Sequence, residues 1–367
     1  MHSVWPSERA ANINLRTQRA FRSGRPRYSV VSITALHHVW MEGYLPGEAE
    51  LADDLNSTGP EEFIAETLNF GSPPDFIIVT CAGAVKEAEL LWDLRQRVGP
   101  EPIIALWLWD NHCNPLGNLS CAHAADLVFF SHRFANEGWF NVFQPNSAAL
   151  THVPACTAQW SHRQAAEYFE KSLTRPRKHK LLINYVLYTM FSEDRRRILL
   201  DYQKGLPDAD VFLMSPGDRS RYSNLDRAGR FAEWANYKAT IIVPLVQDLS
   251  TRVFDALLAG LVLIVPNDIP DFDLVIPRDI QAELGILRTD SLEINEIRDL
   301  SRFALETYDR TGHAGAMARH TFALENHMLV NRVASMLAMF WLIGTGQQKI
   351  VFQHGAKGPA LYASGPA

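Results

Sequence analysis

The stretch that decides the fold is TIIVPLVQDLSTRVFDALLAGLVLIVP, residues 240–266. Residues 241–246 form a short β-branched run, which is typical of a strand buried on both faces. Ser250 is a good N-cap residue for a helix that Gly260 ends, and residues 261–265 are a second apolar run. The order strand, loop, helix, strand predicts a parallel sheet with a right-handed crossover, whose loop opens at the carboxyl edge, where ligands bind.

The loop before this helix has the chemistry of an anion site. The N–H groups of Ser250, Thr251 and Arg252 are expected at the helix N-terminus, where the helix dipole favours negative charge. Arg252 adds a permanent positive charge, so a diphosphate is a natural ligand. One turn later, Asp255 can accept hydrogen bonds from two vicinal hydroxyls, as ribose offers. The alternative is a capped structural helix whose Arg252 pairs with a surface carboxylate, and the local pattern favours neither.

The same run resembles the donor-binding segment of group 1 GT-B glycosyltransferases, especially the spore-maturation-protein-like glycosyltransferases. That segment has Ser or Thr, then Arg-x-Phe-Glu-Ala, a small residue and Gly. The residues that match are Ser250, Thr251, Arg252, Phe254, Ala256 and Gly260. Asp255 replaces the usual glutamate, and Gln247 stands eight positions earlier, where broader retaining families place another glutamate.

The resemblance implies an α/β fold with two Rossmann-like domains facing across a cleft, the GT-B plan. Strand and helix patterns that alternate along the chain agree with it. We expect residues 1–170 to form an acceptor-side N-terminal domain and residues 171–325 to form the nucleotide-sugar donor-binding domain. Residues 326–367 are expected to form a C-terminal helix and a tail that packs back toward the N-terminal domain.

The periodicity also predicts the individual elements. In the first domain we expect strands at 28–34, 75–81, 102–109, 127–131 and 151–154, a loop at 35–44, and helices at 60–70, 85–98 and 120–125. In the second we expect strands at 181–186 and 210–214 before the opening stretch, and helices at 193–204, 230–237, 290–308 and 314–343. The arginine-rich residues 1–27 are interpreted as a solvated leader in preference to an arm on anionic lipid or on a neighbouring subunit.

Candidate catalytic residues follow two strands of the first domain. Asp110 and His112 come after the strand at 102–109, at the carboxyl edge where catalytic groups collect. Either can deprotonate an acceptor hydroxyl in an inverting transfer or orient the sugar in a retaining one. Capping of the next turn by Asp110 is the alternative. His37 and His38 follow the first strand, where the resemblance implies the acceptor side, and packed polar side chains are the alternative reading.

Further donor-side candidates precede the opening stretch or lie within it. Gln247 is expected near the donor sugar. Tyr237 and Lys238 are expected near the donor and Arg219 near the nucleotide phosphates or base, with a solvated surface position as the alternative for each of these three. The glycine-rich loop and basic residue that many GT-B enzymes carry after the first donor-domain strand are not evident, and Arg195 is a candidate substitute.

No metal or cofactor is expected, because GT-B enzymes generally need none and the nucleotide sugar is the substrate. Asp271-Phe272-Asp273 matches the Asp-x-Asp metal motif of the other large glycosyltransferase fold, but it follows Pro270 in a turn-rich stretch and is better read as a turn or cap. Four side chains are also potential zinc ligands: His112, Cys113, Cys121 and His123. Their spacing lacks the short ligand pairs of structural zinc sites, so a zinc site is not expected there.

Composition bounds the class of protein. The 367 residues are 47% apolar, which suffices for two domains with sizeable cores. The net charge of −6 argues against a nucleic-acid binder. The four cysteines contain no CxxC pair, as in a reduced cytosolic protein, and no apolar signal core opens the chain. We therefore expect a cytoplasmic protein, with peripheral membrane contact left open because such enzymes often act on lipid-linked acceptors.

The sequence thus predicts a hexosyltransferase-like glycosyltransferase in glycan biosynthesis. It would move a sugar from a nucleotide-diphosphate sugar to a hydroxyl of a glycan, a lipid-linked acceptor or a small molecule. Two alternatives stay open: a sugar-nucleotide-binding or scaffold protein without catalysis, and a GT-B-type nucleotide-sugar epimerase. The epimerase needs several carboxylates around the sugar, and the sequence offers few.

Overall fold

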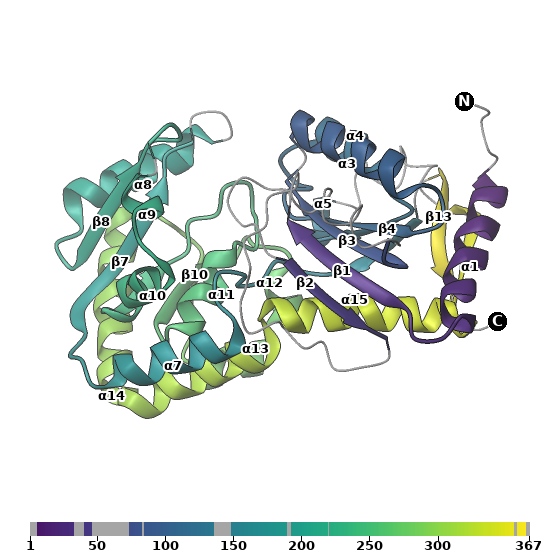
Figure 1. The fold of residues 1–367 in the computed structure, drawn as a ribbon. Helices are drawn as coiled ribbons and strands as arrows, with labels where there is room; N and C mark the ends of the chain where they lie inside the picture. The colour runs from purple at the N-terminus through teal and green to yellow at the C-terminus, as the bar shows by residue number, and fades with distance from the viewer. Residues whose placement is uncertain are drawn as a thin grey trace. The chain divides into compact units, whose positions relative to one another are not determined.

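The computed structural model describes residues 6–32, 40–45, 73–82, 84–135, 148–188, 192–218, 220–355 and 358–364. The chain divides into two compact units (Figure 1), Met1–Pro154 with Val330–Ala367, and Ala155–Leu329. Each unit is an α/β structure around its own largely parallel sheet, as predicted. The division falls before residue 155 rather than after 170, because helix α7 (His162–Leu173) packs on helices of the second unit.

The first unit holds an eight-stranded sheet. Its strands are β1 Arg27–Ser32, β2 Trp40–Tyr44, β3 Phe76–Cys81, β4 Ile103–Leu108, β5 Leu127–Phe130, β6 Ala148–His152, β12 Lys349–Gly355 and β13 Gly358–Ser364. They lie in the order β12-β13-β6-β5-β4-β3-β1-β2. The edge strands β2 and β12 pair antiparallel with β1 and β13, and the other pairs are parallel. The loop predicted at 35–44 is thus corrected: its second half is a strand, which pairing with β1 stabilises.

Helices cover both faces of this sheet. They are α1 Pro6–Arg22, α3 Val85–Val98, α4 Pro115–Ala122, α5 Arg133–Ala135 and α15 Leu329–Gly344. Helices α3 and α4 lie on one face and α15 on the other (Figure 1), where the ring of Phe340 stacks on Phe76 at 4.6 Å between centroids. Successive side chains of β3 therefore point to opposite faces of the sheet: Ile77 packs on the side of α3 and α4, and Phe76 packs on the side of α15. Helix α4 begins five residues before the predicted 120–125, at a proline suited to a first helical turn.

The arginine-rich N-terminus is not a solvated leader. Within α1, Arg9 and Arg16 reach the carboxylate of Asp126 at 2.9 and 2.5 Å, and Arg95 of α3 reaches it at 2.5 Å. Asp126 is fully buried, so an unpaired charge there would be costly. Burial alone would raise the pKa of Asp126, but the three guanidiniums outweigh it and hold that pKa below its ordinary value. These arginines stabilise the fold of the unit instead of awaiting a partner.

The C-terminal residues complete the first sheet. Strands β12 and β13 form a hairpin, and β13 pairs in parallel with β6 through Tyr362 and Ala149. The side chain of Asn14 donates to the carbonyl of Ile350 at 2.7 Å and accepts from its N–H at 2.8 Å. Residues 349–355 and 358–364 thus belong to the first unit.

The second unit contains a five-stranded parallel sheet. Its strands are β7 Lys178–Val186, β8 Ala209–Met214, β9 Tyr237–Ile241, β10 Val262–Pro266 and β11 Leu287–Thr289. They lie in the order β11-β10-β9-β7-β8. Counted along the chain this order is 5-4-3-1-2, that of a doubly wound sheet whose direction reverses between β7 and β9. The strand predicted at 241–246 lies four residues earlier, because Tyr237–Ile241 pairs with both neighbours whereas Pro244 has no N–H for a sheet.

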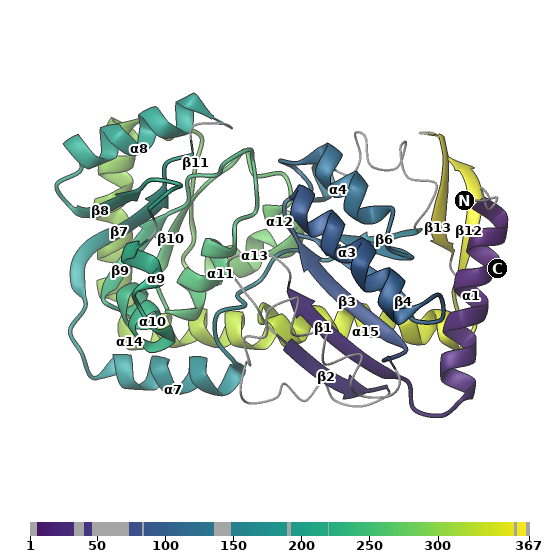
Figure 2. The same ribbon diagram turned by 45° about the horizontal axis from the view of Figure 1, so that its top comes forward.

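Nine described helices surround or follow this sheet. They are α7 His162–Leu173, α8 Glu193–Gly205, α9 Ser220–Ser223, α10 Arg227–Ala235, α11 Thr251–Leu258, α12 Phe272–Val275, α13 Arg278–Glu283 and α14 Ile294–Asn326, and then α15 returns the chain to the first unit. Helices α7 and α14 lie side by side (Figures 1 and 2). The predicted break near residue 312 is a kink in α14 at Gly312, with φ of 55°. Gly260 ends α11 with φ of 80°, where a side chain would also meet the carbonyl of Ala316.

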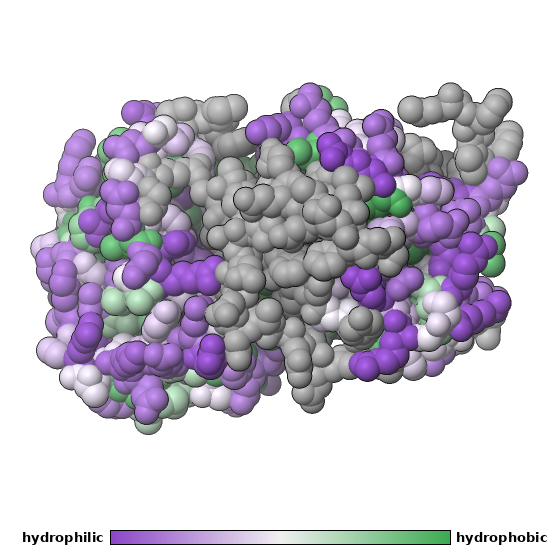
Figure 3. Space-filling model, viewed as in Figure 1, coloured by the Kyte–Doolittle hydropathy of each residue, from purple (hydrophilic) through white to green (hydrophobic). Residues whose placement is uncertain are grey.

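The described surface seen in Figure 3 is mainly hydrophilic, with hydrophobic residues in small separate groups. Leu15, Leu116 and Leu274 are examples of single exposed apolar side chains. None of the helices in the described ranges is both long enough and apolar enough to span a membrane. Peripheral membrane contact stays a prediction.

Candidate functional site: the carboxyl edge of the second sheet

Two helix N-termini meet the carboxyl edge of the second sheet where its direction reverses. Helix α8 follows β7, and helix α11 follows β9. A serine caps each: Ser192 accepts from the N–H of Arg195 at 3.1 Å, and Ser250 accepts from the N–H of Arg252 at 3.4 Å. Ligands of doubly wound sheets bind at this reversal, and both helix dipoles favour an anion there.

Two arginines flank one tyrosine at this place. The guanidinium of Arg252 lies 4.2 Å from the ring centroid of Tyr185, and that of Arg195 lies 4.9 Å from it. The Tyr185 hydroxyl donates to the carbonyl of Ile241 at 2.8 Å and accepts from the N–H of Val243 at 3.0 Å, so the ring is fixed between β7 and β9. The result is a positively charged cluster beside the start of α11, in which Tyr185 and Arg195 are buried and Arg252 is half-buried.

Arg195 has a structural duty of its own. It donates to the carbonyls of Val243 at 3.1 Å and Val186 at 3.0 Å, and it is 8% exposed. Burial lowers its pKa, with a further contribution from Arg252. Arg195 therefore adds positive charge to the site while its bonds tie the ends of two strands together.

Arg252 binds an amide oxygen. Its Nη1 donates to Oδ1 of Asn184 at 2.5 Å, and Nδ2 of Asn184 donates to Glu233 at 3.0 Å. Glu233 in turn forms an ion pair with Arg221 at 2.6 Å. The structural-helix alternative required an ion pair between Arg252 and a carboxylate. Within the described ranges Arg252 forms no such pair. Asn184 carries no signal in the sequence beyond its place near the end of a strand.

Asp255 lies one turn into α11 and is buried, with 4% of its surface exposed. Its Oδ2 accepts from Nε2 of Gln159 at 2.8 Å, and Oε1 of Gln159 accepts from Tyr222 and from Arg230. Burial raises the pKa of Asp255 to about 6, against the opposing effects of Thr157 and Gln159. Oδ1 of Asp255 is buried and accepts no hydrogen bond within the described residues, and the ribose role stays a prediction.

The loop before α11 is compact and contains one residue in the left-handed region. Gln247 has φ of 57° and an exposed side chain. The next residue, Asp248, accepts from the N–H of Leu245 at 2.5 Å. Such backbone strain costs on the order of 1 kcal/mol or more and often occurs beside ligand sites.

The structure does not bring Tyr237 and Lys238 to the site. They begin β9 and so lie at its amino end, away from the carboxyl edge. The Tyr237 hydroxyl donates to Asp210 at 2.9 Å, and Lys238 pairs with Asp309 at 2.5 Å. Their assignment to the donor is thereby corrected: at this end of the strand the buried Tyr237 and the half-buried Lys238 pair with aspartates of their own unit. Arg219, His37 and His38 lie outside the described residues.

In the first unit, Asp110 and His112 follow β4 at the carboxyl edge of that sheet, as predicted from the sequence. Asn111 fixes the loop, since its side chain donates to the carbonyl of His132 at 2.9 Å and accepts from the N–H of His132 at 3.0 Å. The rings of His112 and His132 meet edge to face, with centroids 4.1 Å apart.

Sequence reasoning missed His132, although it follows the next strand along the chain. It is 2% exposed, and burial lowers its pKa well below the ordinary value. The neighbouring His112 and His152 lower it further by charge repulsion. His132 is therefore uncharged at neutral pH and supports the ring of His112.

The metal motif considered in the sequence is a turn in the structure. Asp273 pairs with Arg278 at 2.6 Å and with Arg288 at 2.8 Å, and Asp271 is at the N-cap of α12. The four zinc candidates of the sequence do not form one group either. The described residues contain a different group of potential metal ligands, which includes Cys121.

No protein-family model matches the chain, and no curated protein matches it. Solved structures with a similar fold include the pneumococcal O-GlcNAc transferase GtfA in complex with UDP and GlcNAc, at 13% identity over 83% of this chain and 64% of that one, with a TM-score of 0.42. Sucrose-phosphate synthase from Thermosynechococcus elongatus is 12% identical over 78% of this chain and 77% of that one, with a TM-score of 0.46. The calicheamicin glycosyltransferase CalG4 is 14% identical over 77% of each chain, with a TM-score of 0.32. The chain spans 64% of the length of GtfA, and likenesses this distant decide no activity.

Proposed function

We propose that this protein is a glycosyltransferase that uses a nucleotide-diphosphate sugar as its donor. The observation that carries the proposal is the pair of arginines around Tyr185 at the N-terminus of α11, where the second sheet reverses direction. The resemblance of residues 250–260 to a donor-binding segment points to the same place.

The diphosphate would bind the N–H groups of Ser250 and Thr251 and the guanidinium of Arg252. Negative charge grows on the diphosphate as the glycosidic bond breaks, so donors held in place beforehand stabilise the transition state more than the substrate. Tyr185 and Asn184 hold Arg252 in a fixed orientation, and Arg195 adds charge without moving. Asp255 would hold the ribose in its ionised form, which needs a pH above about 6.

Activation of the acceptor hydroxyl is assigned to Asp110 or His112, with His37 or His38 as further candidates. A neutral imidazole is a suitable base near pH 7, and the uncharged His132 packs edge to face against the ring of His112. The transferred sugar would be a hexose, and the acceptor a glycan, a lipid-linked molecule or a small molecule.

A second candidate function is nucleotide-sugar binding without catalysis. The exposed amide of Gln247 favours it, because a carboxylate is expected there in a retaining enzyme. An epimerase finds less support, because it needs several carboxylates around the sugar. Asp255 and Glu233, the carboxylates linked to Arg252 and its neighbours, are both hydrogen-bonded to protein groups. The double variant Asp110→Asn/His112→Gln separates the first two functions: an enzyme loses transfer and keeps nucleotide binding.

The first experiment is thermal melting with a panel of nucleoside diphosphates and their sugars. A ligand at a hundred times its Kd stabilises the folded protein by about 2.7 kcal/mol, which is readily seen. Arg252→Ala should reduce this stabilisation to about half or less. Arg196→Ala is the matched control, because Arg196 is an exposed neighbour on α8 paired with Glu193. The absence of a shift with every nucleotide would remove the proposal.

A further inference from the structure

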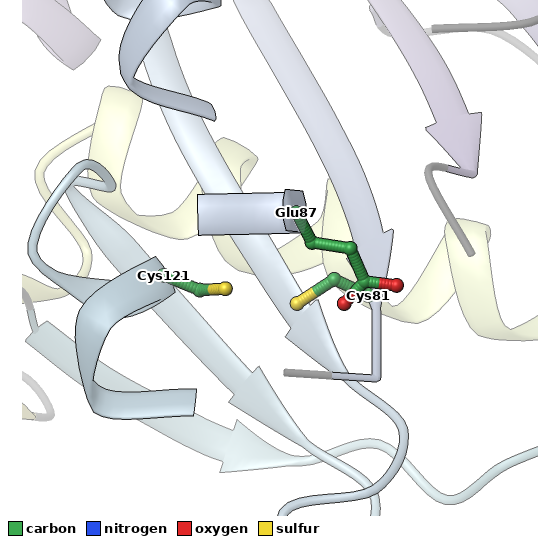
Figure 4. A group of neighbouring side chains, drawn as sticks. All are labelled: Cys81, Glu87 and Cys121. Atoms are coloured by element: carbon green, nitrogen blue, oxygen red, sulfur yellow. The ribbon is translucent and has the colours of Figure 1, made fainter. Parts of the chain in front are cut away.

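Three potential metal ligands come together in the first unit, apart from the residues given a role above (Figure 4). Cys81 is the last residue of β3, Glu87 lies in the first turn of α3, and Cys121 lies in α4. Their ligand atoms all lie within 4.8 Å of one another. Figure 4 shows the two sulfur atoms pointing toward each other, with the carboxylate of Glu87 beside Cys81.

The group is sealed from solvent. Cys81 and Cys121 have no exposed surface, and Glu87 is 6% exposed. Apolar side chains surround both cysteines, among them Ala88, Leu91 and Val128. Burying an ionised carboxylate in such surroundings costs free energy unless the carboxylate is paired or hydrogen-bonded. Burying two neutral thiols has no such cost.

The electrostatics of the place favour anionic ligands. Oε2 of Glu87 accepts from the N–H groups of Ala82 at 3.0 Å and Ala84 at 2.9 Å, immediately before α3. The positive end of that helix stabilises the negative charge of the carboxylate. The same two N–H bonds orient the carboxylate, as outer hydrogen bonds do for metal ligands.

We propose that Cys81, Cys121 and Glu87 bind a thiophilic divalent cation of the Zn²⁺ class. Two thiolates and a carboxylate suit Zn²⁺ better than the hard cations Mg²⁺ and Ca²⁺. Zn–S bonds of about 2.3 Å and Zn–O bonds of about 2.1 Å put tetrahedral ligands roughly 3.6–3.8 Å apart, so closure from separations of up to 4.8 Å needs at most about 1.2 Å of side-chain movement. A water or the second oxygen of Glu87 completes the coordination, and binding releases the two thiol protons.

The site is structural, because its ligands are buried. It joins the end of β3 to the first turn of α3 and to α4, on one face of the sheet. The loop after β4 is tied to the same place, since Nδ2 of Asn114 donates to the carbonyl of Ala82 at 3.1 Å. Bound metal would therefore stiffen the loop that carries Asp110 and His112.

The test uses the full chain, reduced and stripped of metal, and titrates it with Zn²⁺ and with Co²⁺ as a spectroscopic probe. We expect one ion per chain, sulfur-to-cobalt charge-transfer absorption, and release of about two protons. Because Cys81 and Cys121 are already buried, metal-free and Zn²⁺-loaded wild-type protein are alkylated in moderate urea, where Zn²⁺ should slow the modification of these two cysteines, as read by peptide mass mapping. This wild-type measurement does not depend on how well any variant folds.

Variants then assign the ligands. Cys121→Ser and Glu87→Gln should each weaken Zn²⁺ binding by more than about a hundredfold. Loss of a residue that only hydrogen-bonds to a metal ligand typically weakens binding by about 10- to 100-fold, so a larger effect identifies a direct ligand. Cys113→Ser is the matched control, because Cys113 is half-buried after β4 and outside the group, and it should bind as the wild type does. Absence of stoichiometric binding, protection of other cysteines, or a Cys81–Cys121 disulfide with no metal affinity would each overturn the proposal.

Discussion

Two buried aspartates, one in each unit, have opposite environments. Asp126 is surrounded by Arg9, Arg16 and Arg95, and its pKa lies below the ordinary value. Asp255 faces the amide of Gln159 instead, and its pKa rises to about 6. Full neutralisation by arginine marks a carboxylate that holds a fold together. A buried carboxylate with neutral partners can still accept hydrogen bonds from a ligand, as a binding site requires.

The largest expected effect follows from removing the charge of Asp126. Asp126→Asn leaves three guanidiniums around a neutral amide, with Arg16 itself 7% exposed. Breaking such a buried cluster from one side typically costs about 3–5 kcal/mol. The free energy of unfolding by urea measures it. The control Glu101→Gln removes the exposed partner of Arg19 and should cost less than about 1 kcal/mol. Equal effects for the two variants would refute the contrast.

The pH dependence of stability should differ in sign between the two aspartates. Asp255 has a folded pKa of about 6 against an ordinary 3.8, so between these values the folded protein holds a proton that the unfolded chain has lost. Its contribution to stability therefore rises by about 2–3 kcal/mol as the pH falls from about 7 to 4. Asp126 has a lowered pKa, so its contribution is present above 3.8 and is lost at lower pH.

Urea denaturation between pH 4 and 7 tests the contribution of Asp255 through its asparagine variant. Asp255→Asn should lose the gain in stability that the wild type shows toward acid, leaving a flatter profile. A profile parallel to that of the wild type would show that Asp255 is ionised when buried, contrary to its proposed environment.

The smallest expected effect concerns the backbone at Gln247. Because its φ is 57°, Gln247→Gly should raise the free energy of unfolding by up to about 1 kcal/mol. Gln247→Ala keeps the strain and serves as the control. Thermal melting of the two variants is the measurement, and a glycine variant less stable than the alanine variant would argue against the left-handed conformation.

The apolar runs of the sequence predicted most of the parallel strands and the α/β class. Strands β3 and β10 and helix α3 lie where the pattern placed them, because local burial and capping determine them. Strand β2 and the hairpin of β12 and β13 were missed, since they exist by pairing with distant residues. The buried role of Arg16 was missed for the same reason: its partner Asp126 lies 110 positions away.

The candidate site shows the same limit. Ser250 and Arg252 could be found from a local pattern at a helix start. Asn184 and Gln159, which bind Arg252 and Asp255, come from distant segments and carry no local signature. The opposite error affected Tyr237 and Lys238, which are near the motif in sequence but at the other end of the strand.

The most direct test of the central claim is calorimetric titration of the wild type and Arg252→Ala with the nucleoside diphosphate that gives the largest melting shift. Loss of a charged hydrogen bond worth about 1.5–3 kcal/mol predicts an affinity roughly 10- to 100-fold weaker for the variant. Arg196→Ala should bind as the wild type does. Equal affinity of wild type and Arg252→Ala would show that the diphosphate is not held at the start of α11.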